Sequence, residues 1–164
     1  MSEAPRVFAS YSHDSKEHKQ WVAELASTLR HNGIDVVLDQ WELGLGDDIP
    51  GFMEAGITSA DRVLVICTPT YVAKADSGQG GVGYEKMIVT AELVADLGTN
   101  KFIPVIKSGE GDCPLPKCLG TRFFVDFRDE AAFDENLDLL LREIHKEPKQ
   151  RVTLHRIAAR KHGY

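Results

Sequence analysis

Short apolar runs alternate along the chain with stretches in which apolar residues recur every three or four positions. The short runs predict β-strands over residues 6–10, 34–38, 62–67, 101–106 and 123–126. The third run, RVLVIC, is almost entirely apolar, as expected of a central strand that is buried on both faces of a parallel sheet. Pro104 lies inside the fourth run and predicts an edge position or a bulge, because proline has no amide proton to donate.

The longer stretches predict helices. Asp14 and Glu17 resemble a capping box, after which Trp21, Leu25 and Leu29 share one helical face until Gly33 ends the helix. Further helices are predicted over 52–59 and 84–97, and a last helix ends at Pro148. The inward positions of the last two helices are Tyr84, Ile88, Ala91 and Ala95 in one, and Phe133, Leu137, Leu140, Leu141 and Ile144 in the other. Glycine-rich stretches at 40–51 and 77–83 predict loops.

Strands that alternate with helices predict an α/β protein, a flavodoxin-like doubly wound sheet of five parallel strands with helices on both faces. Such sheets bind ligands beyond the carboxyl ends of their strands. This rule marks four segments for chemistry: residues 10–13, 39–48 and 67–71, and the glycine-rich loop that leads to Glu85.

Length and charge refine this picture. A chain of 164 residues predicts one domain, large enough to fold around its own core without disulfides or metals. The net charge of −6 combines two regions of opposite sign, because residues 145–164 carry +5 and residues 1–144 carry −11. We therefore expect a domain over 1–144 and a basic C-terminal extension over 145–164. The extension is either a solvated tail or a linker to a sensor domain outside this chain.

Composition also argues against several classes of protein. The acidic total does not suit a dedicated nucleic-acid-binding domain, whose surface is usually basic. The longest apolar run, 63–67, is too short to cross a membrane, and the first residues lack the apolar core of a signal peptide. Three cysteines fit a reducing compartment, and Cys113 and Cys118 lack the neighbours that a zinc site needs. We expect a cytoplasmic protein that binds no nucleic acid, membrane or metal.

The marked segments exclude some chemistry and leave other chemistry open. SGQGGVGYEK has the order of neither a P-loop nor a dinucleotide fingerprint, so it is either a flexible loop or part of a different site. Ser12, His13 and Asp14 are adjacent and diverge, so they cannot form a catalytic triad. Glu85 falls in the first turn of a predicted helix, where a carboxylate either stabilises the helix dipole or serves catalysis.

Several motifs in this order resemble a TIR domain: VFASYSHDS, a helix with a tryptophan, DVVLDQWELGLGDD, DRVLVICTPTYV and GYEKMIVTAEL. The resemblance covers about residues 6–144. More narrowly, the sequence is similar to bacterial TIR proteins that border the SEFIR group. It implies the flavodoxin-like fold and one of two functions. TIR domains are either signalling modules or enzymes that cleave NAD+ at the nicotinamide–ribose bond with a glutamate, whose position matches Glu85 here.

The resemblance therefore implies a self-assembling NAD+ hydrolase of bacterial antiphage defence that yields ADP-ribose or a cyclic product. NAD+ is the substrate, and no cofactor is implied. A single carboxylate suits this reaction, because the cationic nicotinamide leaves as a neutral molecule without a general acid. The alternative is a non-enzymatic TIR or SEFIR-like module for homotypic signalling. A nucleoside-transferring enzyme of the same fold, which also uses a glutamate, is a more distant alternative.

The resemblance also assigns roles to other residues. The implied substrate-binding residues are Ser10, Tyr11, Ser12, Asp39, Trp41, Tyr71 and Tyr84. The segment 39–48 corresponds to the BB loop, whose implied assembly residues are Leu43, Leu45, Gly46 and Asp47. Trp41 either stacks on a nicotinamide or adenine ring or anchors its loop to the domain. Some NAD-cleaving TIR domains carry a tryptophan four residues before the glutamate, where this chain has Gly81. Either another aromatic residue then stacks on nicotinamide or the activity is weak, and the departure also supports the non-enzymatic alternative.

Overall fold

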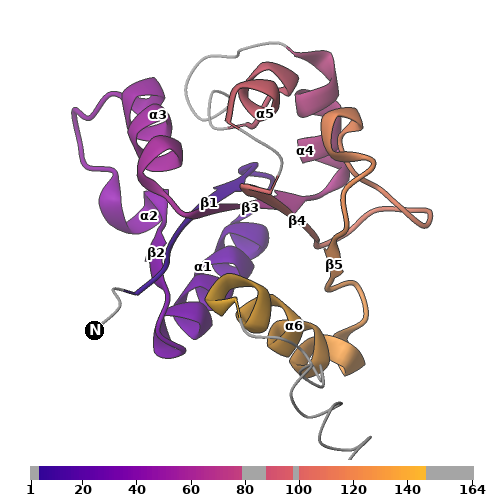
Figure 1. Ribbon diagram of the computed structural model, residues 1–164. Helices are drawn as coiled ribbons and strands as arrows, with labels where there is room; N and C mark the ends of the chain where they lie inside the picture. The colour runs from indigo at the N-terminus through magenta and orange to yellow at the C-terminus, as the bar shows by residue number, and fades with distance from the viewer. Residues whose placement is uncertain (1–3, 79–87, 98–99, 147–164) are drawn as a thin grey trace, which may run out of the picture.

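The computed structural model describes residues 4–78, 88–97 and 100–146 of the chain (Figure 1). Its strands are β1 (Arg6–Tyr11), β2 (Asp35–Val37), β3 (Arg62–Cys67), β4 (Phe102–Ile106) and β5 (Val125–Asp126). Its helices are α1 (Lys16–His31), α2 (Asp39–Glu42), α3 (Ile49–Ser59), α4 (Pro69–Ser77), α5 (Ala91–Leu97) and α6 (Phe133–His145), with 3-10 turns at Lys117–Leu119 and Glu130–Ala132.

The five strands form one parallel sheet in the order β2-β1-β3-β4-β5, which confirms the flavodoxin-like prediction. All six residues of β3 are buried, as its apolar run predicts. Pro104 lies in β4, which is not an edge strand of the sheet. Because β5 is only two residues long and pairs with Val105 and Ile106, Pro104 pairs with β3 alone. On the β5 side Pro104 therefore lies where no strand pairs with it, so its missing amide proton leaves no ladder hydrogen bond unmade there.

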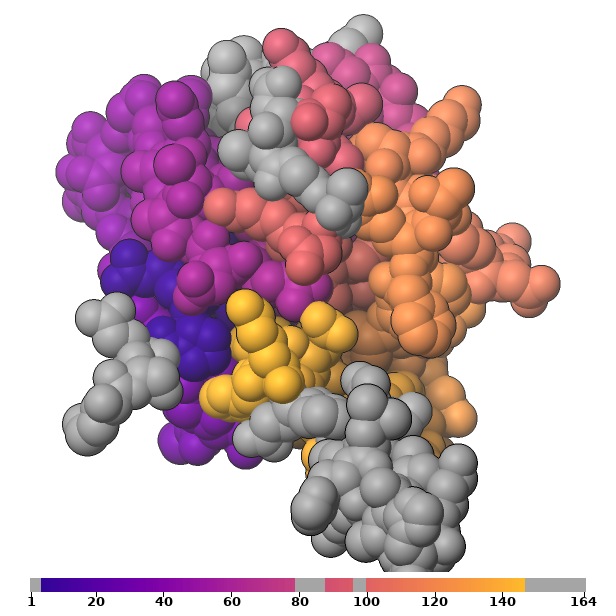
Figure 2. All heavy atoms as spheres, in the orientation of Figure 1, coloured from indigo at the N-terminus to yellow at the C-terminus, as the bar shows by residue number. Residues whose placement is uncertain are grey.

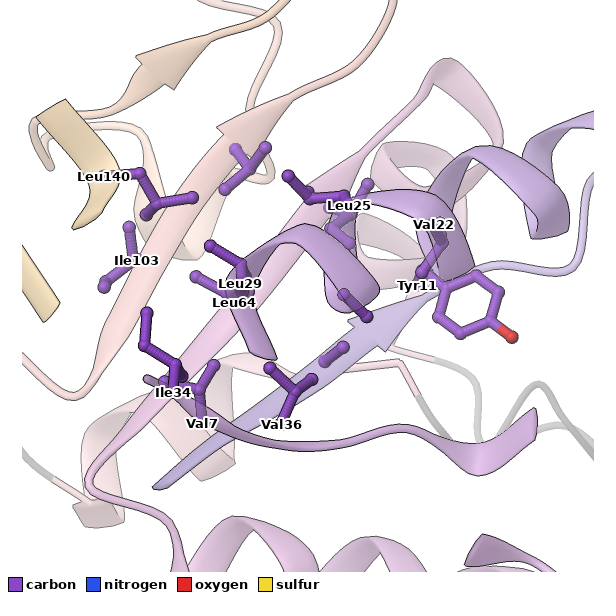
Figure 3. Close-up of a cluster of buried hydrophobic side chains, with 14 of the residues drawn as sticks. Val7, Tyr11, Val22, Leu25, Leu29, Ile34, Val36, Leu64, Ile103 and Leu140 are labelled. Atoms are coloured by element: carbon purple, nitrogen blue, oxygen red, sulfur yellow. The ribbon is translucent and has the colours of Figure 1, made fainter. Parts of the chain in front are cut away.

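Helices cover both faces of the sheet (Figure 1). Helices α1 and α6 contribute Leu25, Leu29 and Leu140 to an apolar cluster on one face (Figure 3). Helices α3, α4 and α5 contribute to a second cluster on the other face, which includes Ile57 and Val94. The apolar stripe predicted for the last helix is confirmed, since Leu140 and Ile144 are buried and the other three members are partly buried.

Helix α1 begins one residue later than the sequence predicts. Ser15, not Asp14, is the N-cap, and its Oγ accepts a hydrogen bond from the His18 amide at 3.0 Å. The predicted stop at Gly33 is confirmed: Gly33 has a φ of +84°, and the Ile34 amide donates back to the Leu29 carbonyl at 3.2 Å. This is a Schellman ending, which favours glycine because it needs the left-handed conformation.

Two prolines that look like loop residues in the sequence lie at helix starts. Pro50 lies in the first turn of α3 after Asp48, whose side chain accepts from the Gly51 amide, so this helix begins three residues before the predicted 52–59. Pro69 likewise begins α4, a helix that the sequence analysis missed. Proline fits the first helical turn because its missing amide proton has no partner there. The predicted loop 40–51 also contains most of the short helix α2.

The predicted helix 84–97 is wrong in its start and in its buried face. Residues 84–87 lie outside the described part, 88–90 are not helical, and α5 begins at Ala91. Ala91 and Ala95 are exposed, whereas Val94 faces the core. Ile88 is buried, but it is not part of a helix, so it does not belong to the inward face predicted for this helix.

Helix α6 ends at His145, and Lys146 follows in the left-handed conformation. Residues 147–164 of the predicted extension 145–164 lie outside the described residues, so the division of the chain at residue 144 stays a prediction. Within the described ranges, no helix combines the length and apolar character that a membrane span requires.

Candidate functional site

The carboxyl ends of β1, β2 and β3 bring together polar side chains that are far apart in the sequence. Ser10 and Tyr11 end β1, Asp39 follows β2, and Thr68 and Tyr71 follow β3. They form a polar network with His13, Ser12 and Gln40, which we call the β1-end network. Its position is the one where parallel α/β sheets bind their ligands.

Tyr71 connects three elements through its hydroxyl group. Its Oη lies 2.8 Å from Ser10 Oγ and accepts a hydrogen bond from the Val89 amide at 2.9 Å. The side chain is fully buried, and this burial raises the pKa of Tyr71 far above its ordinary value, so the hydroxyl is neutral. Tyr71 therefore fixes the residues before α5 to the end of β1.

Asp39 connects β1 to the start of α2. Its Oδ1 accepts from the Tyr11 hydroxyl at 2.7 Å, and its Oδ2 lies 3.0 Å from His13 Nε2. The rings of Tyr11 and His13 stack with their centroids 4.9 Å apart. Gln40 Nε2 donates to Tyr11 Oη at 2.9 Å and also to the Lys19 carbonyl. Figure 3 shows Tyr11 at the end of β1 with its hydroxyl directed away from the apolar cluster.

Ser12 and Thr68 complete the network between β1 and β3. The Ser12 hydroxyl donates to Asp14, and its oxygen lies 3.3 Å from Thr68 Oγ1. Thr68 caps α4 by accepting from the Tyr71 amide. The capping threonine therefore places Tyr71 in the first turn of the helix, above the end of β3.

Most substrate-binding residues predicted in this network are buried in the structure. Ser10, Tyr11 and Tyr71 have no exposed surface, and Ser12 and Asp39 are nearly as buried. The His13 side chain keeps 15% of its surface exposed. Sequence reasoning weighed His13 only as a triad member and missed it as a site residue. The available signal was its position three residues after the predicted strand 6–10, within the segment 10–13 at the ligand-binding end.

His18 lies under this network, and its ring Nε2 has no hydrogen-bond partner among the described residues. Only 7% of its surface is exposed. Its ring meets the Tyr11 ring edge-on at 6.0 Å. Burial lowers the pKa of His18; Asp14 opposes this shift, while Lys107 and His13 add to it. The imidazole is therefore neutral near pH 7 and supports Tyr11 as a packing group.

Trp41 lies outside the β1-end network. The Arg30 guanidinium carbon of α1 is 5.2 Å from the centroid of its ring, and 39% of the residue is exposed. This contact fits an anchor between α2, which carries Trp41, and α1. Ring stacking on a nucleotide stays a prediction for Trp41. Tyr84 and Glu85 lie outside the described residues, and their predicted roles stay predictions as well.

The segment after α2 presents a leucine to solvent. The Gly44 amide donates to Asp47 Oδ2 at 2.7 Å, and the Asp47 amide donates to the Gly44 carbonyl at 3.1 Å. Gly46 has a φ of +90°, which a residue with a side chain rarely adopts. Residues 44–47, which we call the Leu45 turn, thereby hold Leu45 fully exposed. Leu43 precedes this turn as the C-cap of α2.

Within residues 4–78, 88–97 and 100–146, no three His, Cys, Asp or Glu side chains are grouped in a way that could hold a metal ion. The described cysteines are free thiols, and burial raises the pKa of Cys67 to about 12, so this thiol is unreactive.

Known proteins resemble the chain in both sequence and structure. A curated relative, the 2' cyclic ADP-D-ribose synthase BtTIR of Bacteroides thetaiotaomicron, is 36% identical over 63 residues, which are 38% of this chain but only 22% of that protein. A prokaryotic SEFIR domain of known structure is 40% identical, with a TM-score of 0.77, and the match covers 85% of this chain and 98% of that one.

The TIR domain of the Toll-related receptor TRR-2 from Hydra magnipapillata shares the fold at 17% identity. Its TM-score is 0.63, and the match covers 85% of this chain and 97% of that one. The family model described as "TIR domain" matches residues 7–141, which include every described strand and helix up to most of α6. The sequence resemblance is thus confirmed, and the chain belongs to the TIR domain family.

Proposed function

We propose that this chain is an NAD+ hydrolase that cleaves the nicotinamide–ribosyl bond with Glu85. The connection from Ser10 through Tyr71 to Val89 carries the proposal, because it fixes a residue four positions after Glu85 at the ligand-binding end of the sheet. Glu85 precedes Val89 by four residues, which span at most about 14 Å of extended chain. The name of the BtTIR relative, a cyclic ADP-D-ribose synthase, supports chemistry on an ADP-ribosyl group.

The proposed reaction needs one carboxylate. The bond between ribose C1′ and the nicotinamide nitrogen breaks, and its electron pair leaves with nicotinamide, which becomes neutral. Glu85 stabilises the positive charge that develops on the ribose and accepts hydrogen bonds from the ribose hydroxyls. Water then attacks C1′ and releases its proton to give ADP-ribose. A nucleophile within the ADP-ribosyl group gives a cyclic product instead.

The buried network serves this proposal as a rigid support. Each side chain of the β1-end network is fixed by hydrogen bonds or ring contacts, so little reorganisation is needed when a substrate arrives. The domain carries a net charge of −11 over residues 1–144, so long-range attraction does not bring in the anionic NAD+. Local contacts at this edge must therefore supply the binding energy.

We also propose that the active form is an assembly of several copies. Leu45 and Phe123 are fully exposed apolar side chains, one after α2 and the other just before β5. Figure 2 shows the α2–α3 region in purple and the segment around residue 120 in orange on opposite sides of the molecule. Apolar groups on opposite sides suit a head-to-tail contact, which can repeat in an open array.

The last part of the proposal concerns the biological role of the chain. We propose a part in bacterial antiphage defence, with the basic extension 145–164 as the link to a sensor domain that controls assembly. The charge difference between the extension, at +5, and the domain, at −11, supports this arrangement. A sensor is needed because uncontrolled NAD+ cleavage is harmful to the cell that makes the protein.

Product analysis tests the enzyme proposal. Concentrated or surface-clustered protein is incubated with NAD+, and nicotinamide, ADP-ribose and cyclic products are separated by chromatography. We expect Glu85→Gln and Glu85→Ala to lose at least about 100-fold in rate, as removal of transition-state stabilisation does. Glu92→Gln, which changes an exposed glutamate in the first turn of α5, is the matched control and should retain activity. The proposal fails if clustered wild type releases no nicotinamide, or if Glu85→Ala equals wild type.

A non-enzymatic interaction module is the second candidate function. It is supported by the prokaryotic SEFIR domain at 40% identity over 85% of the chain, and by Gly81 where some NAD-cleaving relatives have tryptophan. Calorimetry with NAD+ and light scattering separate the two candidates. Tight self-association without NAD+ binding favours the module, whereas any turnover removes it.

A further inference from the structure

The three cysteines of the chain lie in the same part of the folded domain. Cys67 ends β3, whereas Cys113 and Cys118 belong to the long connection between β4 and β5. Cys67 and Cys118 contribute to the same apolar cluster. Burial raises the pKa of Cys67, and negative charge on Cys118 or Cys113 adds to this shift, so both thiols lie within electrostatic range of Cys67. The fold thus gathers thiols from two distant parts of the sequence.

The connection folds back on itself between Cys113 and Gly120. The Cys113 thiol donates to the Gly120 carbonyl at 3.8 Å, and the Leu119 amide donates to the Pro116 carbonyl at 2.9 Å. Cys118 lies in the 3-10 turn between these partners. Two residues span at most about 7 Å of chain, and Gly120 is two residues beyond Cys118. The backbone of Cys118 is therefore close to the Cys113 thiol.

The two thiols of this connection differ in exposure. Cys113 is exposed, whereas Cys118 is half-buried and packs against the apolar cluster. Burial raises the pKa of Cys118, Asp76 adds to this shift, and Arg122 opposes it. Cys113 is therefore the thiol that a dissolved oxidant meets first. An accessible thiol beside a second thiol that reacts after it is typical of cysteines that sense oxidants.

The 3-10 turn that carries Cys118 is held in place on both sides of this residue. The Lys117 amide donates to Asp76 Oδ1 of α4 at 2.8 Å, and Leu119 is fully buried. A disulfide needs Cα atoms within about 7 Å of each other, which a chain that folds back over five residues permits. The bond then forms when the Cys118 side chain turns from the apolar cluster toward Cys113.

We propose that Cys113 and Cys118 form an oxidative modification site, at which a hydroperoxide converts the two thiols into a reversible disulfide. The Cys113 thiolate attacks the peroxide and its O–O bond breaks, so Cys113 becomes a sulfenic acid and the rest of the peroxide leaves as an alcohol or water. The Cys118 sulfur then attacks Cys113 Sγ, the S–O bond breaks, and water leaves with the Cys118 proton. Two electrons pass from the thiols to the peroxide, and a dithiol reductant reverses the change.

Peptide mapping of the full chain tests the proposal. Dilute, reduced protein is treated with hydrogen peroxide, the remaining thiols are blocked with iodoacetamide, and the protein is digested with trypsin without reduction. Trypsin cleaves after Lys107, Lys117 and Arg122, so peptides 108–117 and 118–122 each carry one cysteine and stay together only if a disulfide joins them. We expect this linked pair to be the main oxidised product and to separate again after treatment with dithiothreitol.

Variants separate the roles of the thiols. Cys118→Ser should leave Cys113 as a sulfenic acid that dimedone labels. Cys113→Ser should lower the oxidation rate of Cys118 at least about tenfold, because the half-buried thiol then reacts without its exposed partner. Cys67→Ala is the matched control, because it removes the fully buried thiol and should leave the yield and rate of the linked peptides unchanged. Circular dichroism checks that each variant is folded.

Several results would overturn the proposal. A disulfide that contains Cys67, a disulfide between two copies of the chain, or oxidation of Cys113 to a sulfinic acid in place of a disulfide would each show that Cys113 and Cys118 are not a redox pair. Equal oxidation rates of Cys118 with and without Cys113 would show the same. This inference goes beyond the proposed function and needs neither NAD+ nor assembly, so its failure leaves that proposal untouched.

Discussion

The hydroxyl oxygen of Tyr71 lies 2.9 Å from the backbone nitrogen of Val89, and both residues are almost completely buried. Tyr71 belongs to the first turn of α4, whereas Val89 precedes α5, so one side-chain hydrogen bond fixes a stretch of backbone that has no helical partner. The same hydroxyl contacts Ser10 at the end of β1. The backbone at Val89, just before α5, is thereby tied to the sheet.

Tyr71→Phe should destabilise the domain by about 1–3 kcal/mol, because the buried Val89 amide and Ser10 hydroxyl lose a partner. Urea unfolding measures this loss. Amide hydrogen exchange should show faster exchange at Val89 than in wild type. Ile144→Val, a core change in the apolar cluster on the other face of the sheet, should cost a similar free energy and leave Val89 protected. Unchanged exchange at Val89 in Tyr71→Phe contradicts the prediction.

His18 should make the stability of the protein depend on pH. Burial lowers its pKa in the folded state below the ordinary value of 6.5, so the unfolded chain binds the proton more readily. The free energy of unfolding should therefore reach its highest value with respect to His18 above pH 6.5, and it should fall as the pH drops below 6.5. His18→Leu should flatten this dependence in urea titrations between about pH 5 and 7.

The control for the pH experiment is Leu25→Ala. It removes apolar contacts from the same helix without removing a titrating group, so it should lower stability at every pH and keep the wild-type slope. An identical slope in wild type and His18→Leu argues against a buried neutral imidazole.

Leu45→Ser should reduce self-association without changing stability. Leu45 is fully exposed on its turn, so its replacement should alter the free energy of unfolding by less than about 0.5 kcal/mol. Light scattering and nicotinamide release should both fall if the Leu45 turn mediates assembly. Asp47→Ala should act in the same direction, because it removes the acceptor of the Gly44 amide and loosens the turn. Oligomer formation that is unchanged in both variants rejects this role for the turn.

Gly56→Ala should strongly destabilise the domain, although it adds only one methyl group. A Cβ at Gly56 would overlap ring atoms of Phe8, so either this ring or α3 must shift. We expect a loss of about 1–3 kcal/mol in thermal or urea unfolding, as is usual for overpacking. Phe8→Leu should restore part of this loss when combined with Gly56→Ala. Additive effects of the two changes are inconsistent with the contact.

The sequence by itself determined the sheet, most of the helices and the family. Each strand is a local apolar run, and the run VLVIC at 63–67 predicts burial on both faces because no polar side chain interrupts it. Gly33 likewise marks the end of α1, since the left-handed conformation there is a local property of the residue. Such signals depend only on residues that are neighbours in sequence, so they predict local structure without knowledge of the tertiary contacts.

Tertiary structure decided which polar residues work together and which are exposed. Nothing in the sequence indicates that Asp39 meets both Tyr11 and His13, because these contacts depend on the packing of β2 and β1 side by side. The start of α5 at Ala91 also escaped prediction, since the Tyr71 hydroxyl satisfies the Val89 amide outside any helix. Periodicity predicts the burial of a helical face, whereas long-range hydrogen bonds are formed only once the chain has folded and water is excluded.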